Sequence, residues 1–426
     1  MLLAALALLP VFAAPTNAAT PNNSLRLSAT YDASATLLWA KAKLKVRSTA
    51  TVTNDTQDGV NALTFNLVPA KIGQMTLKSV TVGETPVVAT KNGQTLTVPL
   101  PAPLAPAGKV TVTIVYVALF GSTATDKQWL FTKAGGIATA YRWIPWLSRL
   151  TAFKRPNIGD PFTTGVSKRV RVSLTSDRPM VYATSGRQTS VDGLTQTFEA
   201  QDVRDFNFTA SPSYLTLSGV LNGVEITVYY RLLPGAKLLQ WTTEAMQRFS
   251  DKVGAYPYPT MSVAEVPFGQ GMESPAMTWV SQVTLASSRK QITIHEAAHQ
   301  WFYSVVGNDQ VSQPFVDEAM TEFLTRDMLG HRASRCAVAA LDSTIYEYTD
   351  ACYYEVIYVQ GDLYLDAYRL RVGDAAFWTG VQNYYQTYRF SISTIRQLFD
   401  TLDAAAPPEL AGGHETRFPR TFPPPA

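Results

Sequence analysis

The run His295-Glu296-Ala297-Ala298-His299 decides how this chain is interpreted. The chain holds four histidines, and two of them lie here, four positions apart, with a glutamate directly after the first. On a helix, residues four apart lie one above the other on the same face, so both imidazoles can reach one ion. Catalytic zinc sites use three protein ligands and a water. The run therefore predicts a zinc site on a helix, with one ligand still to be found.

Glu318 is the best candidate for the third ligand, nineteen positions after His299. The turn-rich residues 307–310 and Pro314 separate the two, so a second helix can fold back and bring its carboxylate to the ion. Two neutral imidazoles and one carboxylate leave a net positive charge, which lowers the pKa of a bound water. Glu296 is then placed to accept the proton of that water. The alternative is a solvated amphipathic helix with incidental histidines.

The pattern of apolar and polar residues changes near residue 214. Before it, alternating apolar and polar residues predict short strands, with a hairpin at Asn92-Gly93. After it, helical spacing dominates. The predicted fold is therefore α+β and multidomain: an all-β saddle or sandwich domain in residues 21–214, a mainly helical catalytic domain in 215–406, and a Pro/Gly-rich tail in 407–426.

The individual elements follow from the same patterns. Strands are expected at residues 42–47, 63–68, 109–117, 168–174, 197–200 and 224–231, and residues 135–161 are interpreted as long loops. Helices are expected at residues 235–253, 292–305, 314–329, 354–371, 374–388 and 393–404.

Composition excludes several classes of protein. The 426 residues carry a net charge of +3, too little for a dedicated nucleic-acid binder. A hydrophobic content of 46% with only 16% charged residues excludes a disordered chain.

The first twenty residues are typical of a signal peptide, because Leu2 to Ala14 is an apolar run of the right length. That run is too short to cross a bilayer, and no later segment qualifies. We therefore expect a soluble protein exported to the periplasm, cell envelope or medium, with a membrane-anchored form as the lesser possibility. Cys336 and Cys352 are either one disulfide or two buried thiols, and both interpretations stay open.

With these residues in place, the chain resembles the gluzincin aminopeptidases of peptidase family M1, the group of aminopeptidase N and leukotriene hydrolase. His295, Glu296, His299 and Glu318 match the family signature, and Gln300-Trp301 match as well. The resemblance implies a β saddle followed by a thermolysin-like domain, one Zn²⁺ per chain, and peptide substrates with a free N-terminus. Larger members add a helical cap, which this sequence does not contain, so we expect a more open cleft.

A second family motif, Gly-x-Met-Glu-Asn, corresponds to residues 270–274. By resemblance, Glu273 binds the α-amino group of the substrate, and Gly271 and Met272 contact its backbone. Gln270 and Ser274 depart from the motif, so details of substrate alignment are expected to differ.

By the same resemblance, Tyr358 hydrogen-bonds the oxyanion of the tetrahedral intermediate. Gln360 stands where the family has lysine. The alternative role for Tyr358 is packing in the core.

Five other residues carry expectations of their own. Glu322 is either a carboxylate partner of a zinc-bound histidine or a solvated side chain. His331 and His414 are expected on the surface or in the tail. Trp143 and Trp146 are expected to pack between the domains.

Three hypotheses remain. The first is a zinc aminopeptidase. The second is an open-cleft zinc peptidase that releases longer fragments or cuts internally, which product analysis distinguishes. The third, a non-catalytic scaffold of the same fold, predicts a protein that purifies without zinc. Side-chain preference at the first substrate position, the natural substrate and the oligomeric state do not follow from the sequence.

Overall fold

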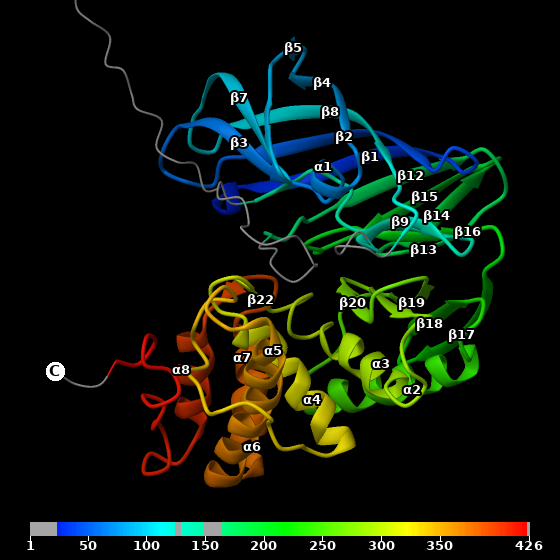
Figure 1. The fold of residues 1–426 in the computed structure, drawn as a ribbon. Helices are drawn as coiled ribbons and strands as arrows, with labels where there is room; N and C mark the ends of the chain where they lie inside the picture. The colour runs from blue at the N-terminus through cyan, green and yellow to red at the C-terminus, as the bar shows by residue number, and fades with distance from the viewer. Residues whose placement is uncertain (1–23, 124–128, 149–163, 424–426) are drawn as a thin grey trace, which may run out of the picture.

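The computed structural model describes residues 24–123, 129–148 and 164–423. In Figure 1 the N-terminal sheets lie above a smaller sheet and a group of helices formed by the C-terminal half. This arrangement confirms the predicted fold class. The predicted signal peptide, residues 1–20, lies outside the described residues.

The described residues of the N-terminal half form three sheets. The largest has eight strands, and two further sheets of four strands pack with it. The eight-stranded sheet has the order β14 (Arg187–Asp192), β15 (Thr195–Ala200), β12 (Val170–Ser176), β1 (Ser28–Leu38), β2 (Lys43–Thr53), β8 (Lys109–Leu119), β4 (Thr76–Val82), β5 (Thr85–Pro86). One four-stranded sheet has the order β13 (Val181–Thr184), β16 (Phe208–Ser211), β10 (Ile137–Ala140), β9 (Phe131–Ala134). The other has the order β11 (Trp146–Leu147), β3 (Val60–Asn66), β7 (Thr95–Leu104), β6 (Thr90–Asn92). The short helix α1 (Pro69–Ile72) follows β3 in the chain.

The strands form where the sequence alternates. Along β1 and β2, every second side chain is buried, because one face of the sheet packs on the core and the other faces solvent. The expected loop region 135–161 is partly wrong: it includes β10 and β11, and residues 149–163 lie outside the described ranges. Four buried residues in a row, Ile137 to Ala140, hide the alternation that marks a strand with one exposed face.

The C-terminal half begins with a five-stranded sheet. Its order is β17 (Leu215–Leu221), β18 (Val224–Tyr230), β19 (Thr260–Val266), β21 (Met277–Ser281), β20 (Gly271–Ser274). β18, β19 and β21 run parallel, and the edge strand β20 pairs antiparallel with β21. The helices are α2 (Gly235–Lys252), α3 (Arg289–Ala298), α4 (Met320–Leu329), α5 (Asp350–Tyr354), α6 (Gly361–Val372), α7 (Asp374–Thr387) and α8 (Ile395–Ala405), and β22 (Gly307–Asn308) pairs with β23 (Ile392–Ser393).

Three predicted helices differ from the observed ones. The helix expected to run to residue 305 ends at Ala298, where Gln300 N and Trp301 N bond to the carbonyls three residues back instead of four. The helix expected over 354–371 is α5 and α6 joined by a π-helical turn, Glu355–Gln360. The helix expected over 314–329 is likewise a π-helical turn, Phe315–Ala319, followed by α4. Single π turns of this kind often lie at functional sites.

The described part of the predicted tail, residues 407–423, is packed rather than free. Phe418 is fully buried and contacts the rings of Phe315 and Phe399. His414, expected on the surface or in the tail, lies in the tail segment but is only 1% exposed, and its Nε2 lies 3.1 Å from Asp403 Oδ2. Burying Phe418 removes apolar surface from water, and this favours docking of the segment. The proline-rich composition of the segment gave no sign of this docking.

The two halves meet through buried polar contacts as well as apolar ones. Arg204, from the N-terminal half, donates to the backbone carbonyls of Ser304, Val305 and Ser391, each at 3.2 Å. Trp143 and Trp146 are both buried, and their rings contact Phe208 and Tyr31 of the N-terminal half respectively; their expected packing between the domains stays a prediction.

Within the described ranges, no helix combines the length and the apolar character that crossing a membrane requires.

Candidate metal and catalytic site

α3 carries the two histidines on one buried face. It packs against β20, β21 and α4, so the side chains of all four elements converge. The imidazole rings of His295 and His299 are 4.8 Å apart. The end of the helix is fixed by Gln300, whose amide donates to Ser274 O and accepts from Ala276 N, both at 2.9 Å. Helix and edge strand are thereby tied together at the site.

A carboxylate orients each histidine. His295 Nδ1 lies 3.0 Å from Glu322 Oε2, and His299 Nδ1 lies 2.8 Å from Asp317 Oδ1. Because a carboxylate only accepts, each Nδ1 carries the proton and each Nε2 is left as a ligand atom. Glu322 is therefore a histidine partner and not a solvated side chain, and Asp317 is a partner that the sequence did not single out.

Both Nε2 atoms face Glu318. The distances from Glu318 Oε2 to His295 Nε2 and to His299 Nε2 are each 3.4 Å. Zinc–ligand bonds of about 2.1 Å in a tetrahedron place neighbouring ligand atoms about 3.4 Å apart. Glu318 Oε2 is buried and has no hydrogen-bond partner among the described residues. The donor set and its spacing therefore fit zinc.

The electrostatics of the site also call for a cation. Burial disfavours the charged form of His295, but the nearby carboxylates of Glu318 and Glu322 outweigh it and raise its pKa to about 10. Burial likewise opposes ionisation of Glu318, yet the two histidines hold its pKa well below the ordinary value. The buried carboxylates thus attract positive charge, and a divalent ion satisfies them in place of protons.

Glu296 lies beside the ligands without being one. It is 6% exposed, and its Oε2 has no hydrogen-bond partner among the described residues. Burial raises its pKa to about 7; the two histidines oppose this shift, and Glu318 and Asp317 add to it. A carboxyl group with a pKa near neutrality, next to a metal site, has the properties of a general base.

The Glu296 carboxylate occupies the space where a side chain at Gly271 in β20 would begin. A Cβ atom at Gly271 would lie 2.5 Å from Glu296 Cδ and 2.7 Å from Cγ, with Oε1 closer still. Only glycine fits there without moving the carboxylate. This contact is a second reason, beside the expected substrate contact, for glycine at this position.

Glu273 and Met272 follow on the same strand, and both are buried. Glu273, Glu296 and His299 each offer a ligand-type atom, and these atoms lie within 4.8 Å of one another. The edge strand therefore brings the expected amine anchor next to the metal site.

Tyr358 lies on the π-helical turn before α6. Its ring stacks on His295 with centroids 5.6 Å apart and contacts Tyr354 at 4.6 Å. Gln360 fixes the turn, because its amide donates to Ala337 O at 2.9 Å and accepts from Arg417 Nη2 at 2.9 Å. The glutamine that replaces the family lysine is thus a buried structural amide.

The loop held by Gln360 is also closed covalently. Cys336 and Cys352 form a disulfide, which resolves the alternatives left open by the sequence. The bond joins this loop to α5, one turn before the segment that carries Tyr358.

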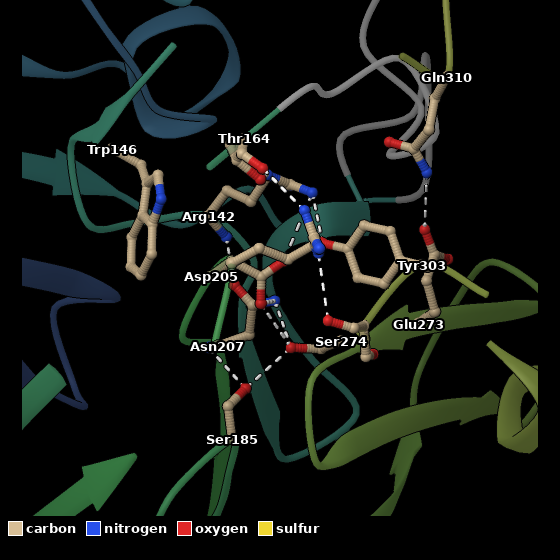
Figure 2. A network of polar contacts seen from close by, with 12 residues as sticks. Arg142, Trp146, Thr164, Ser185, Asp205, Asn207, Glu273, Ser274, Tyr303 and Gln310 are labelled. Atoms are coloured by element: carbon tan, nitrogen blue, oxygen red, sulfur yellow. Dashed lines mark hydrogen bonds and ion pairs between the residues drawn. The ribbon is translucent and has the colours of Figure 1, made fainter. Parts of the chain in front are cut away.

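A buried polar network lies behind Glu273, as Figure 2 shows. At its centre, Asp205 accepts hydrogen bonds from Ser274 Oγ at 2.7 Å, Asn207 Nδ2 at 3.1 Å and the Tyr303 hydroxyl. Arg142 Nη2 lies 3.4 Å from Asp205 Oδ2. Ser274, the residue that departs from the family motif, is therefore a link between the domains.

Neither Asp205 nor Tyr303 was predicted from the sequence to have a role at the site. The local sequence pattern gives no sign of the positive φ of Tyr303. Arg142 Nη2 donates a hydrogen bond to the Tyr303 hydroxyl at 2.5 Å, and this contact helps to hold the strained backbone.

No protein-family profile matches the chain. Among curated proteins, Leucine aminopeptidase 2-2 of Meyerozyma guilliermondii is 31% identical over 139 residues, which cover 29% of this chain and 22% of that protein. Leucine aminopeptidase 2 of Kluyveromyces lactis is 29% identical over 189 residues, 39% of this chain and 27% of that protein. The chain spans about a quarter of the length of these curated relatives.

Solved structures match over nearly the whole chain. An M1 zinc metallopeptidase from Deinococcus radiodurans has a TM-score of 0.70 at 20% identity, covering 94% of this chain and 98% of that one. A variant of it bound to a Tyr-Ser-Ala substrate has a TM-score of 0.69 at 18% identity, with the same coverage. A two-domain M1 zinc metallopeptidase variant bound to L-arginine has a TM-score of 0.69 at 19% identity, covering 91% and 94%. The chain therefore has the fold of the two-domain M1 zinc metallopeptidases.

Proposed function

We propose that the chain is a zinc aminopeptidase of the M1 family, which removes one residue at a time from peptides with a free N-terminus. The observation that carries this proposal is the convergence of two Nε2 atoms and Glu318 Oε2 at 3.4 Å separations, with Glu296 beside them. One zinc ion per chain, held by His295, His299 and Glu318, would polarise the scissile carbonyl and acidify water.

The side chains around that position have distinct roles. Glu296 accepts a proton from the attacking water and returns it to the leaving amine, since its pKa near 7 suits both directions. Tyr358 donates a hydrogen bond to the oxyanion. Gly271 and Met272 lie along the substrate backbone.

Glu273 limits cleavage to the first peptide bond. One of its carboxylate oxygens and a ring nitrogen of His299 lie within 4.8 Å of each other. Consecutive Cα atoms are about 3.8 Å apart, so a single residue spans the distance between an ammonium at Glu273 and a carbonyl at the metal. This spacing favours exopeptidase over internal cleavage. The names of the curated relatives and the ligands of the solved structures support the same substrate class.

The test compares an aminoacyl arylamide with its N-acetylated counterpart, together with elemental analysis for zinc. We expect about one zinc per chain and rapid hydrolysis of the free amine alone. Glu296→Gln should retain zinc and lose turnover. Equal rates on the two arylamides would remove the exopeptidase claim, and internal fragments from a mid-length peptide would do the same.

We also propose that the protein is exported, on the basis of the apolar run in residues 1–20. The Cys336–Cys352 disulfide supports this, because such bonds persist in oxidising compartments. Cell fractionation with an antibody to the protein tests it, and a cytosolic pool alone would contradict it.

A further inference from the structure

Gln310 lies on the loop between β22 and the π-helical turn that carries Glu318. Its side chain is 2% exposed and points at the site (Figure 2). Gln310 Nε2 donates to Asp317 Oδ2 at 2.5 Å and to Glu273 Oε1 at 3.4 Å. One amide group therefore joins the carboxylate that orients His299 to the carboxylate proposed to bind the substrate amine.

Chemistry fixes the orientation of this amide. Nitrogen and oxygen of a glutamine side chain are interchangeable in shape, but both neighbours here are carboxylates, which accept. Turning the amide over would face its oxygen toward two other oxygens. The NH₂ group must therefore point at Asp317 and Glu273.

The other end of the amide is unsatisfied. Gln310 Oε1 is buried and has no donor within hydrogen-bond distance among the described residues. An orphaned buried acceptor of this kind destabilises the fold, because it has lost water without gaining a donor. The glutamine is therefore explained by the two carboxylates to which it donates, and not by packing alone.

We propose that Gln310 is a positioning residue for the aminopeptidase reaction, holding Glu273 toward the α-ammonium of the substrate and Asp317 toward His299. This inference rests on the proposed function. A neutral donor suits this role, because it orients Glu273 while leaving its negative charge for the substrate. A lysine at 310 would neutralise that charge and compete with the substrate ammonium. The hydrogen bond to Glu273 is the longer of the two, as expected where this carboxylate also has to bind a cation.

The proposal predicts a specific pattern for Gln310→Met and Gln310→Leu. Each removes the orphaned acceptor together with the donor to the buried Asp317, and these two effects on stability oppose each other, so the melting temperature should change little. Binding of a free amine should weaken about tenfold or more, and zinc affinity should fall about tenfold, the range seen when the partner of a metal ligand is lost.

Binding is measured in a Glu296→Gln background, so that turnover does not interfere. Calorimetric titration of zinc-loaded protein with L-leucinamide and with N-acetyl-L-leucinamide gives the discrimination between free and blocked amines. Competition with a chelator gives the zinc affinity. Kinetics of the Gln310 variants with Glu296 intact should show KM rising more than kcat falls, because the anchor is affected before the base.

Gln313→Met is the matched control, since this glutamine lies on the same loop and its Oε1 accepts from Ile395 N at 2.8 Å, away from the site. It should change neither amine discrimination nor zinc affinity. Gln310 variants that discriminate between the two amides as well as the control does would overturn the inference while leaving the proposed function intact. If protein with Gln310 in place fails to discriminate, the proposed function fails instead.

Discussion

Replacing Gly271 by alanine tests whether the space beside Glu296 is required for catalysis. The new Cβ atom would lie 2.5 Å from Glu296 Cδ, whereas ordinary contacts begin near 3.4 Å. Since Gly271 lies on a β-strand, its backbone is held by β21, and the glutamate side chain must move. The displacement required is about 1 Å, the difference between the two distances.

A shift of about 1 Å in a reacting group costs on the order of 100-fold in rate. We therefore expect kcat to fall about 100-fold, which is about 2.7 kcal/mol in activation free energy. Stability should move the other way, because alanine is favoured over glycine inside a strand by roughly 0.5–1 kcal/mol. Low activity in a protein that is at least as stable as the wild type is the expected signature.

The assay is hydrolysis of an aminoacyl arylamide, with thermal unfolding and zinc content measured on the same preparations. Gly219→Ala is the control: it lies in β17 of the same sheet, and its Cβ would meet Leu239 no closer than 3.6 Å. A Gly271→Ala enzyme with full zinc content and a kcat within about threefold of wild type would refute the steric argument.

Three further predictions concern stability. Asp205→Ala removes a buried carboxylate that pairs with the buried Arg142 and should cost about 3–5 kcal/mol in chemical denaturation; a loss below about 1 kcal/mol would show that other groups carry the interface. Burial, reinforced by the negative charge of Glu322, raises the pKa of Asp362 to about 8 in the folded protein. The pKa in the unfolded chain is about 3.9. The folded state therefore holds the proton more tightly, and the free energy of unfolding falls as pH rises between these two values. Asp362→Asn should therefore gain at least about 1.4 kcal/mol relative to wild type between pH 5 and 8, and parallel pH profiles would contradict this. Reducing the Cys336–Cys352 disulfide should lower the free energy of unfolding by about 3 kcal/mol, and an unchanged melting temperature in reductant would count against it.

Local pattern was enough to predict the elements that decide the fold. From the helical spacing of His295 and His299 and from the turn before Glu318, we predicted that these three side chains lie together, and they do. Helix geometry alone links the two histidines, whereas Glu318 requires the chain to fold back. The predicted change from strands to helices near residue 214 is less sharp than expected, because five strands, β17 to β21, follow it.

Contacts that depend on tertiary packing could not be predicted. Asp317 and Gln310 are polar residues in a turn and a loop, and nothing local distinguishes them from solvated ones. Beyond α3, the backbone of Tyr303 takes a positive φ, and its side chain hydrogen-bonds to Arg142 and Asp205, which are distant in sequence. His414 was expected in a tail because composition does not reveal which segments find a partner surface.

The guanidinium of Arg204 has a consequence for any effort to redesign the protein. It reaches three main-chain oxygens of the other half, at Ser304, Val305 and Ser391. Expressing the metal-bearing half by itself, or grafting it onto a foreign scaffold, would strip those oxygens of their donor just beyond His299. Engineers who wish to shorten this molecule would have to supply a replacement cation at that junction, or the excised fragment would lose the turn that ends its ligand helix.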